Sequence, residues 1–393
     1  MSDAYIISAV RTPVGRAFKG GFRNYRPDDL LAHALTEALK EVPQLDPNRI
    51  EDVIVGCAMP EAEQGMNVAR IGALLAGLPE TVPGVTVNRF CSSGLQTIAM
   101  AADRIRTGDA HVMVAAGTET MTMVPMMGHK VAMNPRVFSD DNIGIAYGMG
   151  ITAENVANQW KISRDDQDAF AYHSHQKAIE AIDSNLFTEV RPVTVTSHQP
   201  DLESGAIRSV ETVVAHDEGP RRDTTIEALS KLRPVFNARG SVTAGNSSQM
   251  SDGAAALILV SERVLKELNI EPLGVFRGFS VAGVAPEIMG IGPIEAIPRV
   301  LKQTGINQQD IDWIELNEAF AAQSLAVIRQ LDLPIEKVNP LGGAIALGHP
   351  LGATGAILGA KLLHGMKRTG NRYGMVTMCI GTGMGAAGIF ERV

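Results

Sequence analysis

The amino-acid sequence predicts an α/β protein in which helices cover a mixed sheet. Strand-like and helix-like patterns alternate in the first and last thirds of the 393-residue chain. Glycine is abundant (39 residues) and aromatic residues make up 5% of the chain, which favours close backbone packing and tight turns. A chain of this length buries about 75% of its unfolded surface and needs no disulfide or metal for stability. The length allows two or three domains.

The first third of the chain alternates short β-rich runs with helical patterns. Asp28–Lys40 has six apolar side chains at helical spacing. Gly77 and Pro79 end a second helical pattern. In chain order, we expect strands at Ala4–Val10, Ile50–Gly56, Val85–Asn88 and His111–Ala116, and helices at Asp28–Lys40, Val68–Leu78 and Ser92–Arg106.

The last third repeats this plan. The segment Asn-Arg-Ile-Glu-Asp-Val-Ile-Val from Asn48 is similar to Gln-Asp-Ile-Asp-Trp-Ile-Glu-Leu from Gln309, and the strand-like Val338-Asn339 echoes Val87-Asn88. We interpret the repeat as two halves with one topology, with chance similarity of two βα units as the alternative. The expected elements are helices at Ile294–Thr304, Ala319–Gln330 and Gly352–Met366, and strands at Asp310–Leu316 and Gly374–Cys379.

The middle of the chain, residues 121–251, has a different pattern. Five methionines lie between Met121 and Met133 without a clear period, Asp165–Ile182 predicts an amphipathic helix, and Pro192–Pro220 is polar and irregular. This pattern indicates an inserted loop domain, where binding functions often reside. The methionines either line an adaptable apolar pocket or fill core and interface space.

Charge and cysteine content exclude several classes of protein. The chain has 35 basic and 43 acidic residues, and its basic runs, such as Arg221-Arg222, are two residues long. This suits one small anionic ligand but not a nucleic acid. Three widely spaced cysteines form neither a disulfide framework nor a C-x-x-C pair. The N-terminus lacks a secretory pattern, and the apolar runs are too short to span a bilayer. We therefore expect a cytoplasmic protein without a membrane span.

The segment Asn88–Gly94 contains the first candidate for chemistry. Cys91 follows a β-run and precedes a helix, and the positive N-terminal end of a helix favours a thiolate. This position makes Cys91 a candidate nucleophile. The alternative is an inert buried cysteine, which is the more common fate of a free thiol.

Three further segments have the same strand–loop–helix setting. His349 lies in a turn of the glycine-rich segment Gly342–Gly355, which has no phosphate-loop lysine. Cys379 ends a strand and enters a glycine turn whose N–H groups can face an anion, although close packing also explains such glycines. Asn317 either caps the following helix or orients a water at an oxyanion. Such junctions face one crevice in layered α/β folds, so His349 can activate Cys91. No cluster has metal-ligand spacing, and we expect no metal.

These segments resemble the signatures of the thiolase family, in the same order and over essentially the whole chain. The resemblance implies a five-layered αβαβα fold of two βαβαβαββ halves with a loop domain between them, and a homodimer or homotetramer. It divides the chain into an N-terminal half (1–120, with 252–272 returning to it), a loop domain (121–251) and a C-terminal half (273–393). The matching segments are Arg11–Arg16, Asn88–Gly94, Gly117–Met121, Asn317–Phe320, Gly343–Gly355 and Cys379–Gly388.

The resemblance also implies a role for each matching residue of the site. Cys91 corresponds to the nucleophile that accepts the acyl group, and His349 to its base. Cys379 corresponds to the acid/base that handles the α-carbon proton of acetyl-CoA. Asn317 corresponds to the residue that holds a water in one oxyanion hole. The N–H groups of Cys91 and Gly381 correspond to the second hole.

The binding residues follow in the same way. Arg221 and Ser248 correspond to contacts with coenzyme A, and Met149 and Phe320 to residues beside the substrate. Coenzyme A would be a cosubstrate, with no permanently bound cofactor. The implied reaction is thiolytic cleavage of 3-oxoacyl-CoA in fatty-acid β-oxidation, through an acyl-Cys91 intermediate. A hydratase/dehydrogenase partner is a further expectation.

Several alternatives to a degradative thiolase stay open from the sequence. The segment Cys91-Ser-Ser-Gly94 looks more like degradative members, whereas biosynthetic members usually have Cys-Gly-Ser-Gly. Gly148 stands where many short-chain biosynthetic enzymes have histidine, which would leave space for a longer acyl chain. The main alternative is a biosynthetic acetyl-CoA acetyltransferase that condenses two acetyl-CoA molecules. A non-catalytic lipid carrier and a ketoacyl synthase are less consistent with the presence of both Cys91 and Cys379.

Overall fold

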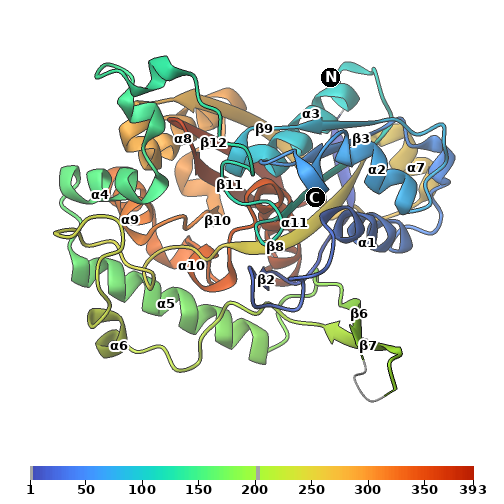
Figure 1. The fold of residues 1–393 in the computed structure, drawn as a ribbon. Helices are drawn as coiled ribbons and strands as arrows, with labels where there is room; N and C mark the ends of the chain where they lie inside the picture. The colour runs from blue at the N-terminus through green and yellow to red at the C-terminus, as the bar shows by residue number, and fades with distance from the viewer. Residues whose placement is uncertain (1–2, 201–203) are drawn as a thin grey trace.

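The computed structural model describes residues 3–200 and 204–393 (Figure 1). One large mixed sheet organises these residues, in the order β10-β11-β12-β9-β1-β8-β5-β3-β4, with the short β2 paired to β8. Its strands are β1 (Ala4–Arg11), β2 (Gly15–Arg16), β3 (Asp52–Gly56), β4 (Gly84–Val87), β5 (Val112–Thr120), β8 (Ser251–Ser261), β9 (Gly274–Gly283), β10 (Ile311–Leu316), β11 (Tyr373–Ile380) and β12 (Met384–Glu391).

The sheet consists of two parts joined at one place. In the first part of the sheet, β4, β3, β5 and β1 come from the first part of the chain, and β8 joins them between β5 and β1. The second part of the sheet consists of β9, β12, β11 and β10, which come from the C-terminal part of the chain. Two residue pairs between β1 and β9, Tyr5 with Val275 and Ile6 with Gly274, connect the parts. Each part combines parallel pairs (β3 with β4 and β5, or β10 with β11) with antiparallel pairs. This equivalence supports two halves of similar topology.

Helices cover the outer face of each part. α1 (Pro27–Lys40) has proline at its start and acidic residues in its first turn, which suit a helix N-terminus, and it packs its apolar side against β8 and β5. α2 (Val68–Leu75) packs on α1, and α7 (Glu262–Leu268) lies at the edge near β1 and β8. On the C-terminal part, α8 (Gly292–Thr304) packs on β9 and β12. α9 (Ala321–Gln330) contacts α4 (Met149–Gln159) and α5 (Arg164–Asp183).

Two helices form the central layer between the parts of the sheet. α3 (Ser93–Thr107) and α11 (Thr354–Thr369) pack on each other, and each contacts strands from both parts. A Cβ atom on Gly94 would lie 2.5 Å from the backbone nitrogen of Ala356, and one on Gly355 would lie 2.1 Å from that of Leu95. Glycine is therefore required where the first turns of the two helices touch. This contact brings the N-terminal ends of both helices to one place.

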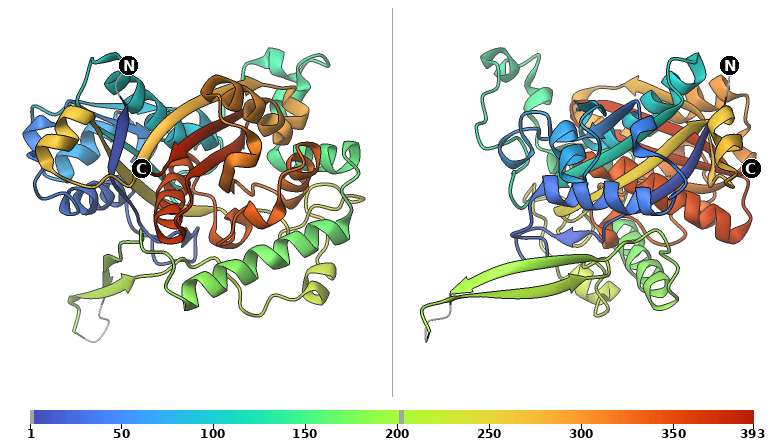
Figure 2. Two further views of the ribbon diagram at one scale, coloured as in Figure 1. Left: turned by 180° about the vertical axis from the view of Figure 1, so that it is seen from behind. Right: turned by 90° about the vertical axis from the view of Figure 1, so that its right-hand side faces the viewer.

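The middle segment adds helices and a hairpin outside the sheet. The antiparallel strands β6 (Val193–Pro200) and β7 (Ile207–Val214) extend away from the body of the protein (Figure 2). α5 runs along the same side of the molecule in Figure 1. Two short helices are α6 (Ile226–Ser230) and α10 (Ala344–Leu347). The 3₁₀ turns are η1 (Pro47–Arg49), η2 (Ala62–Gln64), η3 (Phe90–Ser92), η4 (Pro135–Phe138), η5 (Ile143–Ala146), η6 (Pro286–Ile291), η7 (Gln308–Asp310), η8 (Ile335–Lys337) and η9 (Leu351–Ala353).

The sequence patterns identify most elements but miss those without a clear period. Every strand and helix expected in the first third is present, with ends that differ by a few residues. The strands β8 and β12 have no alternation because nearly all of their side chains are buried, and β9 has none because glycines interrupt its apolar residues. The polar Pro192–Pro220 segment contains the β6–β7 hairpin, so the expectation of irregular structure there is wrong. Val338-Asn339 forms only an isolated bridge to Ile314, because Asn339 has a positive φ and its side chain bonds the Leu316 backbone.

The methionine-rich stretch does not act as one unit. Met121 is buried beside Ala58 and Leu351, in a small cluster that also contacts Cys91. Met126 and Met127 are exposed.

Candidate active site

Cys91 lies in the η3 turn that leads into α3. The preceding residue, Phe90, has a φ of 45°, and Asn88 supports this unusual turn by accepting a hydrogen bond from the Phe90 N–H at 2.8 Å. Asn88 also donates to the Ala58 carbonyl, which ties the turn to the end of β3.

The Cys91 thiol holds its proton at neutral pH. Desolvation raises the pKa of Cys91 to about 11, although hydrogen bonds from the Gly381 and Cys91 N–H groups favour the thiolate. The helix N-terminus was expected to favour the thiolate, but loss of water outweighs it here. Cys91 therefore needs a base at neutral pH.

Cys379 brings a second thiol to the same place from the C-terminal part. It lies near the end of β11, fully buried, and η3 contacts β11. Burial, together with the nearby Cys91, raises the pKa of Cys379 well above its ordinary value. Gly381 follows in the next turn, where a Cβ would meet only Met149 and Phe90, at 3.6 and 3.9 Å. The structure thus brings Cys91, Cys379 and Gly381 together.

His349 reaches the site from the loop between α10 and η9. The residue before His349 has to be glycine, because Gly348 has a φ of 105°. Cys91 packs in one cluster with Leu351, two residues beyond His349. Desolvation lowers the pKa of His349 to about 4, so its imidazole is neutral at pH 7.

Thr354 fixes the tautomer of this imidazole. Asn317 Nδ2, 3.3 Å from His349 Nε2, can only donate, so on the other side of the ring the Thr354 hydroxyl accepts from Nδ1 at 2.6 Å and donates to the Pro350 carbonyl at 2.9 Å. Nδ1 therefore carries the proton, and the lone pair is on Nε2. A neutral imidazole with its lone pair on Nε2 is the form that can take a proton from a thiol.

Asn317 lies beside the basic nitrogen of the imidazole. It follows β10, and its N–H donates to the Thr377 carbonyl at 2.9 Å. Its Nδ2 is 3.3 Å from His349 Nε2, and its buried Oδ1 has no hydrogen-bond partner. An unsatisfied buried amide oxygen suits a bound water or a polar ligand atom. It is not the helix cap, since Phe320 occupies that position at the start of α9.

Apolar side chains form the wall next to Cys379. Phe320, Met289 and Ala153 pack in one buried cluster with Cys379, and Met149 contacts it. The Phe236 ring meets Phe320 edge to face at 6.0 Å between ring centres. The predicted residues Met149 and Phe320 thus lie at the site.

The two residues predicted to contact coenzyme A lie on the outer side of the site. Arg221 is exposed and lines a cavity of about 200 Å³ with His175, Asp223, Gln249 and residues of α6. Ser248 precedes Gln249, and its N–H donates to the Ala319 carbonyl at 2.9 Å. Both residues therefore belong to segments that border the Asn317–Phe320 loop or the α10 loop. A larger cavity, of about 460 Å³, lies between α5, α9 and η8.

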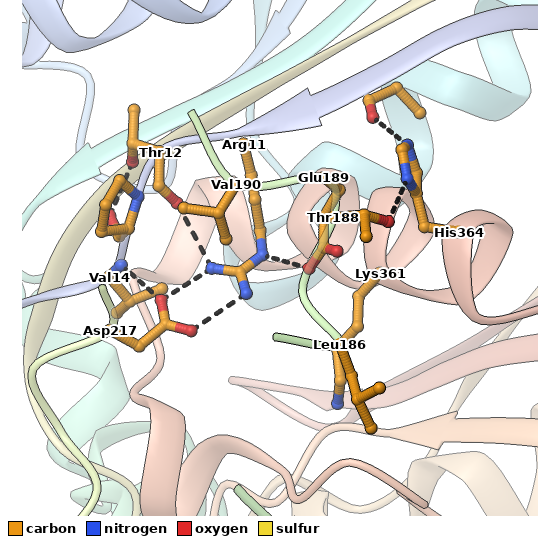
Figure 3. A network of polar contacts seen from close by, with 12 residues as sticks. Arg11, Thr12, Val14, Leu186, Thr188, Glu189, Val190, Asp217, Lys361 and His364 are labelled. Atoms are coloured by element: carbon orange, nitrogen blue, oxygen red, sulfur yellow. Dashed lines mark hydrogen bonds and ion pairs between the residues drawn. The ribbon is translucent and has the colours of Figure 1, made fainter. Parts of the chain in front are cut away.

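A buried arginine anchors the chain that carries Arg221 (Figure 3). Arg11 is 1% exposed and binds Asp217 with two nitrogens at 2.7 and 2.9 Å, while its Nε donates to Glu189 at 2.9 Å. Glu189 and Asp217 flank the two ends of the β6–β7 hairpin. Gln249 then donates to the Gly219 carbonyl, two residues before Arg221. Asp217 also accepts from the Val14 N–H, so this network fixes the segment against the end of β1.

Sequence reasoning missed two residues of the site. Thr354 lies five residues after His349, a spacing within one glycine-rich segment that could have suggested a contact. Glu119 lies in the matched segment Gly117–Met121, yet its carboxylate is buried and bonded to backbone groups from both parts of the site.

No group of three or more histidine, cysteine or acidic residues suited to a metal occurs within residues 3–200 and 204–393. No helix in the same range is long and apolar enough to cross a membrane.

Two family descriptions match nearly the whole chain. "Thiolase, N-terminal domain" matches residues 4–263 and "Thiolase, C-terminal domain" matches residues 270–392. Two solved structures cover 100% of the chain and 99% of their own chains. They are the Bacillus anthracis acetyl-CoA acetyltransferase (TM-score 0.90, 39% identity) and human mitochondrial 3-ketoacyl-CoA thiolase (TM-score 0.89, 37% identity). The expected five-layered fold is confirmed by these matches.

Two relatives with similar sequences are named 3-ketoacyl-CoA thiolase. The "3-ketoacyl-CoA thiolase" of Bacillus subtilis (strain 168) is 52% identical over 392 residues and covers 100% of both chains. The peroxisomal "3-ketoacyl-CoA thiolase A" of Rattus norvegicus is 49% identical and covers 99% of this chain and 89% of the relative.

Proposed function

The chain belongs to the thiolase family, and from that premise we propose that it cleaves 3-oxoacyl-CoA with coenzyme A. The products are acetyl-CoA and an acyl-CoA shorter by two carbons. The observation that carries this proposal is that two thiols from different parts of the sheet lie close enough to interact, beside the loop that carries a neutral imidazole with its lone pair on Nε2. A hydrolase needs one nucleophile, whereas carbon–carbon cleavage also needs an acid for the leaving carbanion.

In the first half of the reaction, His349 Nε2 takes the Cys91 proton. The thiolate then attacks the 3-keto carbon, and the oxyanion that forms accepts hydrogen bonds from preorganised donors. When the bond between C2 and C3 breaks, its electron pair goes to the acetyl-CoA enolate and the acyl group stays on Cys91. Cys379 donates its proton to the enolate carbon. The raised pKa of Cys379 supports this role, because a thiol that holds its proton in the resting site can serve as an acid.

In the second half, the proton on His349 returns to the Cys379 thiolate. Coenzyme A replaces acetyl-CoA and gives its thiol proton to His349, and its sulfur attacks the acyl-Cys91 thioester. Cys91 leaves as a thiolate and recovers a proton from His349. We assign the water-binding role to Asn317, because its buried Oδ1 is unpaired beside His349 Nε2. The N–H groups of Cys91 and Gly381, which already face the Cys91 sulfur, are assigned to the second oxyanion hole.

The binding roles are part of the same proposal. Coenzyme A lies along the segment with Arg221 and Ser248, and Met149 and Phe320 border the acyl and pantetheine path. Substrates with longer chains are favoured over acetoacetyl-CoA. The absence of a side chain at Gly148, directly before Met149, supports this preference. The acetyltransferase direction is the less favoured candidate, because the relatives at 45–52% identity are named 3-ketoacyl-CoA thiolase.

The proposal includes the organisation of the protein. The N-terminal half is residues 1–120 with 252–272, the loop domain is 121–251 and the C-terminal half is 273–393. The pairing of β8 with β1 and β5 supports the return of 252–272 to the first half. We also infer a cytoplasmic homodimer or homotetramer, with a hydratase/dehydrogenase partner as a further proposal. Coenzyme A acts as a cosubstrate.

Two substitutions test the division of labour between the thiols. Cys91→Ala should abolish both thiolysis of 3-oxohexadecanoyl-CoA and acyl exchange between acetyl-CoA and labelled coenzyme A. Cys379→Ala should abolish thiolysis and retain part of the exchange, because exchange breaks no carbon–carbon bond. Equal loss in both assays would contradict the roles. A strict preference of the parent for acetoacetyl-CoA would contradict the proposed chain length.

A further inference from the structure

Glu119, near the end of β5, is a fully buried carboxylate that no step of the proposed reaction uses. One oxygen accepts hydrogen bonds from the Ala58 N–H at 2.7 Å and the Gly352 N–H at 2.8 Å. The other accepts from the Gln64 side chain at 2.6 Å and the Met59 N–H at 3.3 Å. Burial raises the pKa of Glu119, but all four of these partners are N–H donors, and the Cys57 thiol lies 3.9 Å from the second oxygen, so the hydrogen bonds favour the ionised carboxylate. A protonated carboxyl would place an O–H donor among them.

The hydrogen bond from the Ala58 N–H connects Glu119 to the turn that carries the nucleophile Cys91. Ala58 follows β3, and its carbonyl accepts a hydrogen bond from Asn88 Nδ2 at 2.9 Å. The Oδ1 atom of Asn88 holds the Phe90 N–H in the strained turn before Cys91. Glu119 thus holds the backbone on which the position of Cys91 depends.

The hydrogen bond from the Gly352 N–H connects Glu119 to the turn next to the base His349. Gly352 is in η9, between His349 and Thr354, and Thr354 fixes the His349 ring. A Cβ on Gly352 would lie 2.6 Å from both the Ala58 nitrogen and the Cys57 Cα, and 2.7 Å from a Glu119 oxygen. The η9 turn is therefore pressed directly onto the end of β3, and the carboxylate bonds both segments through one oxygen atom.

We propose that Glu119 is a positioning residue that sets the Cys91 thiol against the His349 imidazole by bonding the backbone beneath each. The inference rests on the proposed pairing of Cys91 with His349. Glu119 acts on the distance and angle between the two groups and does not contact the reacting atoms. Its negative charge by itself raises the pKa of Cys91, so loss of this charge in Glu119→Gln favours the thiolate and a slower reaction must come from lost positioning. A misplacement of about 1 Å in such a pair costs about 100-fold in rate.

Glu119→Gln tests this role, with Glu51→Gln as a matched control. Glu51 is also a carboxylate that accepts backbone N–H bonds, from His111 and Val112, but at the other end of β3 and β5. We expect Glu119→Gln to lower kcat for thiolysis by about 10- to 100-fold with KM values unchanged. Glu51→Gln should retain the parent kcat. A KM increase without a fall in kcat would overturn the proposal.

A second readout separates positioning from general loosening. Alkylation of Cys91 by iodoacetamide at pH 7, followed by mass spectrometry, reports thiol activation by His349 without any need for thiolysis. We compare the slowing of alkylation that Glu119→Gln causes in the parent with the slowing that it causes in a His349→Asn variant. The slowing in the parent should be larger by at least about threefold, because the two residues act on one proton transfer. A smaller difference overturns the proposal.

If Glu119→Gln does not fold, Asn88→Asp replaces it in the same comparison. This variant replaces the donor to the Ala58 carbonyl by a charged oxygen and retains the acceptor for the Phe90 N–H, and the added charge is the same in the parent and His349→Asn backgrounds. The same threefold criterion applies. Absence of thiolysis in the parent would refute the proposed function, whereas the alkylation comparison would still decide the role of Glu119.

Discussion

Replacement of Thr354 by valine tests whether the His349 tautomer controls the reaction. Valine has nearly the shape of threonine but lacks the hydroxyl that accepts the Nδ1 proton at 2.6 Å. The Pro350 carbonyl loses one donor but retains the Ala353 and Thr354 backbone N–H groups, each at 3.0 Å. The unsatisfied group is therefore the Nδ1–H of the buried imidazole.

The size of the effect follows from this geometry. A buried N–H without an acceptor costs about 1–3 kcal/mol. The ring can avoid this cost by moving its proton to Nε2, which removes the lone pair that faces Asn317 and the substrate. Since about 1.4 kcal/mol corresponds to a factor of ten, kcat/KM for thiolysis should fall by about 5- to 150-fold.

The assay compares three variants by steady-state thiolysis and by the burst of Cys91 acylation. Thr354→Ser restores the hydroxyl and should restore most of the rate. Thr97→Val is the control, because the buried Thr97 hydroxyl donates to the Gly94 and Ala116 carbonyls, away from the imidazole. If Thr354→Val lowers the rate no more than Thr97→Val does, the reasoning from the tautomer is refuted.

Three further outcomes follow from the structure. Asp217→Asn breaks a buried ion pair, a change that costs about 3–5 kcal/mol; the KM for coenzyme A should rise more than kcat falls, and an unchanged KM would contradict the anchoring of Arg221. Gly355→Ala should lower the urea midpoint of unfolding strongly because its Cβ would meet backbone at 2.1 Å, whereas Gly359→Ala meets only a side-chain end at 3.1 Å and should be tolerated. The folded-state pKa of His349 is lowered to about 4, so as the pH falls from 6.5 to 4 the unfolded chain takes up a proton that the folded protein does not. The parent should therefore lose up to about 3 kcal/mol of unfolding free energy over this range, and His349→Gln should not. Equal losses in urea titrations would contradict this.

The sequence was most informative where one local rule decided the structure. The apolar spacing of α1 and the turn residues that end α2 predicted those helices. Cys91, His349, Cys379 and Asn317 stood out because each follows or precedes a strand or helix at a junction. The strands β8, β9 and β12 escaped prediction because burial on both faces, or glycine content, removes the alternation that identifies a strand.

The ionisation state of the site also could not be predicted locally. The helix N-terminus next to Cys91 suggests a thiolate, yet desolvation raises the pKa of Cys91 to about 11. Desolvation depends on segments that are up to 290 residues away in sequence, such as the Gly381 turn and the α10 loop.

The sequence by itself determined the α/β class, the chemistry-bearing residue types and their order along the chain, since these depend on local spacing and side-chain chemistry. Only the tertiary structure decided that Thr354 fixes the proton on His349 and that Glu119 bonds the backbone beneath both Cys91 and His349. The physical reason is that each of these relations is a contact between groups whose separation is set by packing. The glycine contact between α3 and α11 brings two distant parts of the chain within hydrogen-bonding range.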